Sequence, residues 1–286
     1  MPPRRGPSGA RPGSLGGYPL HAPVPVYRCT RRYTTIVRGN GGDGGRNVDI
    51  EGYRARLRAA LPDVRERIER AAARGGRSGR VDLVVVTKGH PPAAALAAAA
   101  EGVARCGENR VQELADKVEA VAASEAPSPP IEWHMIGHLQ RNKVRRAVPH
   151  FALIHSIDSE RLARALSEEA GRTGREVEGL VQVNVSGEEA KGGIREGYVD
   201  AVGRICELDG LRVRGLMTMA PLTEDEVRVR ATFRRAREVF DACAEGLEGF
   251  TASYLSMGMS LDYEVAVEEG STMVRLGTVL LGERGR

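Results

Sequence analysis

The feature that most constrains the fold is a repeated change between short apolar, β-branched segments and longer stretches with helical spacing. Eight apolar segments are present: 82–87, 103–107, 131–137, 153–157, 179–185, 212–217, 252–256 and 273–278. Continuously apolar strands separated by helices are typical of a parallel sheet that helices cover. Eight such units in about 240 residues predict an α/β fold, a single (β/α)8 TIM barrel.

The stretches between these segments predict the helices of the barrel: 92–100, 109–122, 140–147, 159–173, 195–208, 225–246 and 261–269. Asn109 and Ser159 are the expected N-caps of two of them. An extra amphipathic helix is expected over residues 49–74, where Pro62 could introduce a kink. The alternative is a doubly wound open sheet, but no Gly-x-Gly-x-x-Gly sequence follows any of the strands.

Residues 1–48 differ in composition from the rest of the chain. They are rich in Gly, Pro and Arg and contain eight arginines against Asp43, a net charge of +7, whereas the whole chain carries +4 and the remainder therefore −3. Such a segment cannot bury enough apolar surface to offset the entropy of ordering. We predict a disordered extension over 1–48 and one domain over 49–286. A start codon placed too far upstream, an organelle-targeting segment and an RNA-contacting arm are the alternatives.

Composition also bounds the class of protein. The four cysteines are widely spaced and form no C-x-x-C pair, so neither a disulfide framework nor a thiolate zinc site is expected. No apolar run approaches the roughly 20 residues that a membrane-spanning helix needs. His134 and His138 would lie about 13 Å apart along a strand, too far for one metal ion. We expect a cytoplasmic protein without a metal site that binds neither membranes nor nucleic acid.

Lys88 follows the Val-Val-Val run of the first predicted strand. In a (β/α)8 barrel the chemistry lies where strands end and the following loops begin. Partial burial at that point would lower the pKa of the lysine amine and leave it available to attack an aldehyde. The alternative is a lysine that merely extends to solvent from the end of a strand.

Small residues follow the seventh and eighth predicted strands, in the segments 256–260 (SMGMS) and 275–278 (RLGT). Backbone amides at the start of a helix bind anions, and the loops after strands seven and eight of such barrels commonly hold phosphate. Ordinary turn chemistry is the alternative for either loop. With Lys88, the two loops predict a site for a phosphorylated aldehyde.

Seven segments of the chain resemble, in order, those of the YggS/PROSC family of proteins that bind pyridoxal 5'-phosphate (PLP). They are LVVVTKGHP (83–91), CGENRVQE (106–113), IEWHMIGHLQRNK (131–143), IHSIDS (154–159), VQVNVSGEEAKGG (181–193), GLMTMAP (215–221) and LSMGMSLDYEVAVEEGSTMVRLGTVLLGER (255–284). The resemblance covers residues 49–284. It implies a single barrel related to the N-terminal domain of alanine racemase, with PLP held on a lysine as a Schiff base, an internal aldimine.

The resemblance also implies roles for ten residues of this chain. They are Lys88 as the lysine bound to PLP, Ser256, Gly258, Met259 and Ser260 in the phosphate-side loop, Gly277 and Thr278 as the other phosphate contact, Arg275 near the pyridine nitrogen, and Asn109 and Met219 in the pocket lining. The chain departs from the family at three places. Gly89-His90 follows the lysine in place of the common Thr-Lys pair, Cys106 replaces a phenylalanine and Leu281 replaces an aromatic residue, which puts the shape of the pocket in question.

The function that the resemblance implies is control of intracellular PLP (vitamin B6 homeostasis) rather than catalysis. An arginine beside the pyridine nitrogen disfavours its protonation and so weakens the ring as an electron sink. Racemases of the related barrel add a second domain, whereas this chain ends eight residues after Thr278. We therefore expect a monomer with an open site that passes PLP to apo PLP-dependent enzymes. The alternatives are a fold-related amino-acid racemase or decarboxylase that acts with a partner, and an interaction protein whose PLP only signals B6 status.

Overall fold

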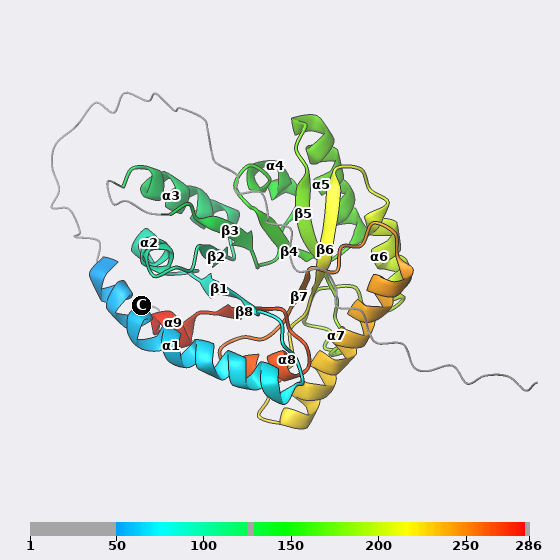
Figure 1. Cartoon of the computed structure of the whole chain (residues 1–286). Helices are drawn as coiled ribbons and strands as arrows, with labels where there is room; N and C mark the ends of the chain where they lie inside the picture. Colours follow the sequence, from blue (N-terminus) through cyan, green and yellow to red (C-terminus); the bar gives the residue numbers. More distant parts are fainter. Residues whose placement is uncertain (1–49, 125–128, 284–286) are drawn as a thin grey trace, which may run out of the picture.

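The computed structural model describes residues 50–124 and 129–283, and this part of the chain forms a closed barrel of parallel strands surrounded by helices (Figure 1). The strands are β1 (Asp82–Val86), β2 (Arg105–Glu108), β3 (Glu132–Met135), β4 (Leu153–Ile157), β5 (Val177–Gln182), β6 (Leu211–Met217), β7 (Tyr254–Ser256) and β8 (Met273–Leu276). Each strand pairs with its neighbour in sequence, and β8 pairs with β1. The predicted (β/α)8 barrel is confirmed and the open sheet is excluded. The predicted extension over 1–48 lies outside the described residues.

The helices are α1 (Ile50–Arg74), α2 (Pro92–Ala100), α3 (Val111–Ala122), the 3-10 helix η1 (Arg141–Lys143), α4 (Val144–Ala147), α5 (Glu160–Thr173), α6 (Tyr198–Cys206), α7 (Glu226–Gly246), α8 (Tyr263–Glu268) and α9 (Thr278–Leu281). Ser159 caps α5 as predicted, since its side chain accepts a hydrogen bond from the Leu162 amide. None of the described helices is long and apolar enough to cross a lipid bilayer.

Several element bounds differ from the sequence prediction, and two of these differences lie next to the predicted site. The N-cap of α3 is Arg110 and not Asn109, because the backbone of Asn109 lies directly against Gly137 at the end of β3, where an added Cβ would come 2.5 Å from the Asn109 carbonyl oxygen. The predicted eighth strand was too long. Gly277 (φ −116°, ψ −81°) leaves the extended conformation, so β8 ends at Leu276 and Thr278 begins the unpredicted α9.

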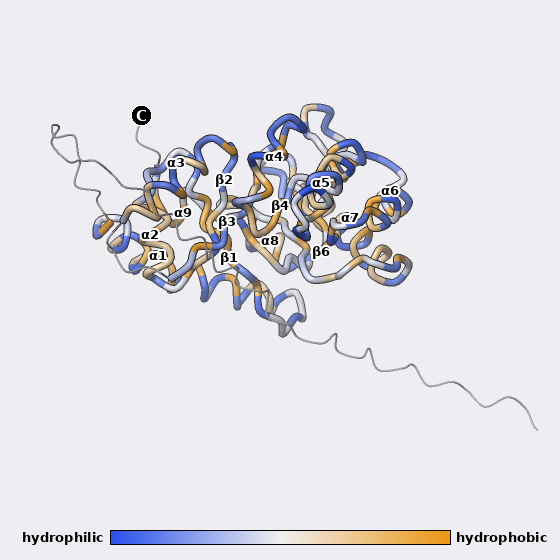
Figure 2. Tube along the Cα trace, turned by 90° about the horizontal axis from the view of Figure 1, so that it is seen from above, coloured by the Kyte–Doolittle hydropathy of each residue, from blue (hydrophilic) through white to orange (hydrophobic). Residues whose placement is uncertain are grey.

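Apolar side chains are divided between the inside of the barrel and the layer between strands and helices. Six buried residues fill the inside: Val84, Leu153, Leu180, Met217, Tyr254 and Met273. Two larger clusters lie between the sheet and the helices. In Figure 2 hydrophobic residues recur along the strands and on one side of the helices, while hydrophilic residues gather on the outer loops. Packed apolar side chains therefore lie inside the barrel below its mouth.

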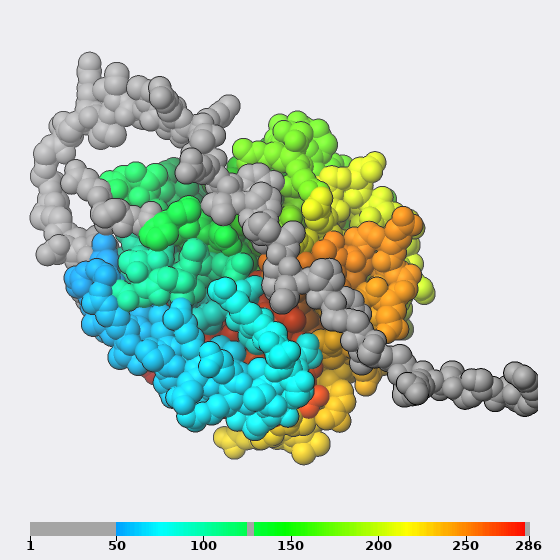
Figure 3. Space-filling model, viewed as in Figure 1, coloured from blue at the N-terminus to red at the C-terminus, as the bar shows by residue number. Residues whose placement is uncertain are grey.

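The extra N-terminal helix α1 is part of the domain. It buries Leu57, Leu61, Val64 and Ile68 against the barrel. Ion pairs tie it to α8, among them Arg74 Nε to Glu268 at 2.6 Å. In Figure 3, α1 (blue) runs along the flank of the molecule and the C-terminal part of the chain (red) is seen in part beside it. The predicted helix over 49–74 is confirmed and is continuous through Pro62.

Candidate functional site

Lys88 lies in the turn that directly follows β1 and is half-buried. Val84 belongs to the cluster inside the barrel and Val85 to the cluster under the helices, so side chains alternate between the two faces along β1. Thr87 continues this alternation toward the helices, since its hydroxyl donates to Glu108 Oε1, the oxygen that also accepts from Lys117 of α3. Lys88 is the next residue and lies in the turn at the carboxyl end of β1, where its amine is predicted to face the mouth of the barrel.

Gly277, at the end of β8, lies beside the end of β1. The two strands pair in register, with Val85 opposite Leu276. A Cβ added to Gly277 would come 3.4 Å from Cβ of Val86, which is ordinary van der Waals contact. The segment that contains Lys88 and one predicted phosphate loop are therefore neighbours. Thr278 is exposed and begins the single turn α9, in which the amides of Leu280 and Leu281 donate to the Gly277 carbonyl at 2.9 Å.

The other predicted phosphate loop, residues 256–260, starts at the last residue of β7 and leads through a tight turn into α8. Gly258 has φ +96°, and a Cβ there would come 2.7 Å from Cβ of Ala266, so this position requires glycine. The amide of Met259 donates to Asp262 Oδ1 at 2.6 Å, which fixes the turn. Met259 is exposed and Ser260 is half-buried.

A chain of buried hydrogen bonds crosses the inside of the barrel beneath these loops. Arg275 donates through Nη1 to the hydroxyl (2.6 Å) and carbonyl (2.9 Å) of Ser256, and through Nη2 to the Thr218 carbonyl (3.1 Å). The Ser256 hydroxyl also lies 3.1 Å from Nδ1 of His155, whose Nε2 lies 2.9 Å from Nδ1 of His134. In one consistent arrangement of protons, Arg275 donates to the Ser256 hydroxyl and this hydroxyl donates to Nδ1 of His155. Nε2 of His155 then donates to Nδ1 of His134. The hydroxyl of Ser256 is thus engaged inside the barrel, and its predicted contact with phosphate stays a prediction.

Burial sets the charge states of this chain of hydrogen bonds. It lowers the pKa of His134 to about 3, with a smaller contribution from Arg105. The pKa of His155 is also lowered, chiefly by burial and then by His134 and Arg275. Burial lowers the pKa of Arg275 to about 10, which Asp262 partly offsets. At neutral pH both imidazoles are neutral and the guanidinium is a fully buried cation.

We expect the free energy of unfolding to fall when the pH is lowered from 7 to 6. The unfolded chain protonates a histidine near pH 6.5, whereas folded His134 and His155 remain neutral, so the unfolded state binds more protons below that pH. The two residues together remove about 1 kcal/mol of stability between pH 7 and pH 6, and more below it. Urea titrations at several pH values measure this loss.

The test variant for this pH dependence is the double substitution His134→Gln and His155→Gln. The control variant is His138→Gln. The double variant should show a smaller change in the free energy of unfolding between pH 7 and pH 5 than the unmodified chain. His138 is exposed and bonded to Asp158, so its replacement should leave the buried contribution in place. A free energy of unfolding that does not change between pH 7 and pH 5 in the unmodified chain would contradict neutral, buried imidazoles.

The remaining predicted residues also lie at the ends of strands. Asn109 directly follows β2 and is half-buried. Met219 follows β6, is half-buried and packs against the cluster inside the barrel. The structure thus places all ten predicted site residues on or just after β1, β2, β6, β7 and β8. His134 and His138 have different partners, and within residues 50–124 and 129–283 no three His, Cys, Asp or Glu side chains gather as a metal site.

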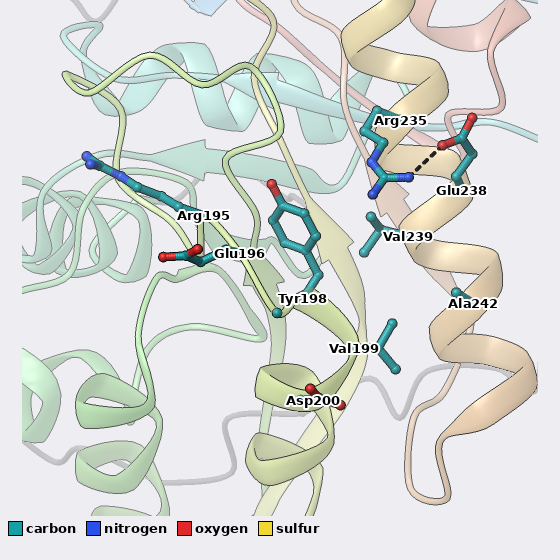
Figure 4. A pocket seen from close by; sticks show the side chains of 10 residues that line it. Arg195, Glu196, Tyr198, Val199, Asp200, Arg235, Glu238, Val239 and Ala242 are labelled. Atoms are coloured by element: carbon teal, nitrogen blue, oxygen red, sulfur yellow. Dashed lines mark hydrogen bonds and ion pairs between the residues drawn. The ribbon is translucent and has the colours of Figure 1, made fainter.

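A surface cavity of about 440 Å³ lies elsewhere, between α6 and α7 (Figure 4). Tyr198, Val199 and Val239 line it, and Arg235 forms an ion pair with Glu238 at 2.8 Å on its α7 side. None of the predicted site residues lines this cavity. It belongs to the helix layer and not to the strand ends that carry Lys88.

Several residues of the site were not found from the sequence. His155 and His134 carry the buried chain of hydrogen bonds, and Lys117 holds the backbone next to Lys88. A polar residue in an otherwise apolar strand, as in LIHSI, was the available signal for His155. Lys117 lies one helical turn after Glu113, and this spacing was open to the ordinary interpretation of a solvated helix face.

Comparison with known proteins decides the family. The sequence pattern described as alanine racemase, N-terminal domain, matches residues 60–285. A pyridoxal phosphate homeostasis protein of Aquifex aeolicus is 40% identical over 226 residues, which cover 78% of this chain and 96% of that protein. The chain belongs to the YggS/PROSC family of pyridoxal phosphate homeostasis proteins.

Solved structures of similar sequence have the same barrel. PipY of Synechococcus elongatus, solved with PLP bound, is 37% identical and superposes with a TM-score of 0.65 over 77% of this chain and 100% of its own. A protein of Bifidobacterium adolescentis is 35% identical, with a TM-score of 0.74 over 80% of this chain and 96% of that one. The resemblance noted in the sequence is confirmed.

The residues present fit PLP. A half-buried lysine follows β1, and glycine turns at Gly258 and Gly277 follow β7 and β8 at the same end of the barrel. Within the described part of the chain Arg275 forms no ion pair with a carboxylate, so this buried cation is balanced only by neutral acceptors and the field of Asp262. An aldehyde, a phosphate and a pyridine nitrogen match these three groups in chemistry.

Proposed function

We propose that this chain binds PLP covalently through Lys88 and takes part in intracellular PLP homeostasis. One observation carries the proposal. PipY has been solved with PLP bound, and this chain matches the whole length of PipY at 37% identity. In this chain Lys88 and Gly277 directly follow the paired strands β1 and β8. A lysine beside a glycine turn at the mouth of a barrel suits a phosphorylated aldehyde.

Each predicted site residue has its own role in binding PLP. Lys88 holds the aldehyde carbon of the cofactor. Backbone amides in the turn at Gly258 and Ser260, on either side of Met259 whose own amide is bonded to Asp262, and those at Gly277 and Thr278, bind the phosphate, as anions are bound at helix starts. Ser256 supports the first turn from below. Arg275 lies near the pyridine nitrogen, and Asn109 and Met219 line the pocket. When bound, PLP supplies a reactive aldehyde and a ring that can accept electrons.

The charge of Arg275 favours a carrier over a catalyst. Its guanidinium is buried and remains a cation at neutral pH, since its pKa is lowered only to about 10. A cation near the pyridine nitrogen opposes protonation of that nitrogen and so weakens the ring as an electron sink. We propose a monomeric cytoplasmic carrier without catalytic activity of its own. Its domain spans residues 49–286, and apo PLP-dependent enzymes receive its PLP.

The proposal is tested by mixing the PLP-loaded protein with an apo-aminotransferase and following the recovery of aminotransferase activity. We expect recovery, and we expect no amino acid to exchange its α-proton in D₂O faster than with free PLP. Faster exchange for any amino acid would favour a racemase or decarboxylase. Retained PLP without transfer would favour a protein that senses B6 status. Light scattering should give a mass of 30.8 kDa for the monomer.

A further inference from the structure

The turn that carries Lys88 rests on a buried cluster of charged and polar side chains on β2 and α3. We call Thr87, Glu108, Glu113 and Lys117 the β1–α3 clamp. Thr87 and Glu108 are fully buried and Lys117 is 4% exposed. The Thr87 hydroxyl donates to Glu108 Oε1 at 2.5 Å, and Lys117 Nζ donates to the same oxygen at 2.6 Å. Buried charges of this kind persist only when they are paired.

The clamp holds the backbone on both sides of Lys88. On one side, Lys117 Nζ donates to the carbonyl of Thr87 at 2.7 Å. On the other, the amide of Gly89 donates to Glu113 Oε1 at 2.6 Å, and Lys117 Nζ lies 2.9 Å from that same oxygen. Gly89 has φ +72°, a left-handed conformation that turns the chain immediately after the lysine. One ammonium group thus connects both peptide groups that flank Lys88.

The chemistry of the clamp separates the roles of the two lysines. The ammonium of Lys117 has three hydrogens, and it makes three short contacts, to Thr87, Glu108 and Glu113. It is therefore not available to attack an aldehyde. Burial alone would raise the pKa of Glu113, but the Gly89 amide and Lys117 outweigh burial and lower it. Glu113 is therefore ionised at neutral pH and binds the Gly89 amide as a charged acceptor.

We propose that Glu113 and Lys117 are positioning residues, which fix the turn 87–89 so that the amine of Lys88 faces the bound aldehyde. The inference rests on the proposed function, because it assigns the clamp to capture of PLP by Lys88. Correct orientation of reacting groups contributes strongly to rates, and a misplacement of about 1 Å can cost as much as a hundredfold. The clamp does not touch the cofactor and acts only through the backbone of the turn.

Glu113→Ala is the most direct test, since Glu113 is 28% exposed and its loss leaves the buried Glu108–Lys117 pair intact. Glu119→Ala, at an exposed position on the same helix, is the matched control. Stopped-flow absorbance of the full chain mixed with PLP measures covalent capture. We expect capture to slow about tenfold or more in Glu113→Ala and to stay within about twofold of the unmodified chain in Glu119→Ala. Glu113→Gln, which keeps an acceptor oxygen, should recover part of the rate.

A second readout separates positioning from general loss of structure. In a Lys88→Ala background PLP binds without the covalent bond, and Glu113→Ala should change that affinity by less than about twofold, because the phosphate loops lie on other strands. An equal loss of capture rate and non-covalent affinity would overturn the proposal, as would capture at the unmodified rate.

A third readout does not need PLP. Hydrogen exchange of the peptide around Gly89 in the protein without cofactor should be faster in Glu113→Ala than in Glu119→Ala, since the amide loses its acceptor. Unchanged exchange would overturn the clamp. If the unmodified chain captures no PLP, the proposed function fails, while this exchange measurement still decides whether the clamp holds the turn.

Discussion

Lys88→Ala is expected to abolish the covalent adduct with PLP and to release most of the cofactor on dialysis, whereas the unmodified chain retains it. Lys88 follows β1, whose last residue Val86 lies against Gly277, and the buried Lys117 cannot replace it because its ammonium is engaged in three contacts. Apparent affinity should fall at least about tenfold, equivalent to about 1.4 kcal/mol. Equilibrium dialysis followed by chemical quantification of PLP measures the loss.

Lys143→Ala is the matched control for this prediction. Lys143 lies in η1, between β3 and β4, and is not part of the predicted site. Its replacement should leave retention of PLP unchanged. If Lys88→Ala retained PLP as firmly as the control, Lys88 would be an ordinary lysine at the end of a strand.

Gly215→Ala is expected to cost about 3–5 kcal/mol of the free energy of unfolding, from backbone strain together with displaced packing. Gly215 lies in β6 with φ +142°, and an added Cβ would lie 1.9 Å from the carbonyl oxygen of Tyr254 on β7. The methyl group can be accommodated only if β6 and β7 move apart. Because Thr218 follows β6 and accepts from Arg275, the strain should also reach the site. Urea denaturation measures the stability change.

Gly171→Ala provides the comparison for this effect. Gly171 lies in α5, and no atom would come within 4 Å of an added Cβ. Alanine is favoured over glycine inside a helix, so this variant should be unchanged or more stable by about 0.5–1 kcal/mol. A similar stability for both glycine variants would mean that β6 and β7 do not approach as closely as the structure has them.

The fold could be predicted from the sequence because each strand carries its own signal. Runs such as LVVV (83–86) are apolar on both faces, as expected of strands covered by helices outside and packed side chains inside. The ends of elements were less accurate. The predicted strands at 131–137 and 273–278 were too long, since the apolar pattern continues beyond the point where the backbone leaves the ladder.

The site could be predicted only where one segment carries the whole signal. Lys88 after β1 and the glycine turns at Gly258 and Gly277 are local features, and the structure places each at the end of a strand. The contact between His155 and Ser256 joins residues 101 positions apart, and it exists only because β4 and β7 enclose the same barrel. No periodicity or spacing reports such a contact.

The clamp at Lys117 was missed for a related reason. Its spacing from Glu113 is that of a common surface ion pair on a helix. Only the packing of α3 over the end of β1 buries Lys117 and brings its charge to the backbone beside Lys88. Burial therefore distinguishes a solvated pair from one that holds a functional turn.

The most direct test of the central claim is borohydride reduction of the PLP-treated protein followed by peptide mapping. The account predicts visible absorbance that disappears on reduction, and a single pyridoxyl group on the peptide that contains Lys88. A protein that stays colourless with PLP, or a reduced adduct spread over surface lysines with none on Lys88, would contradict it.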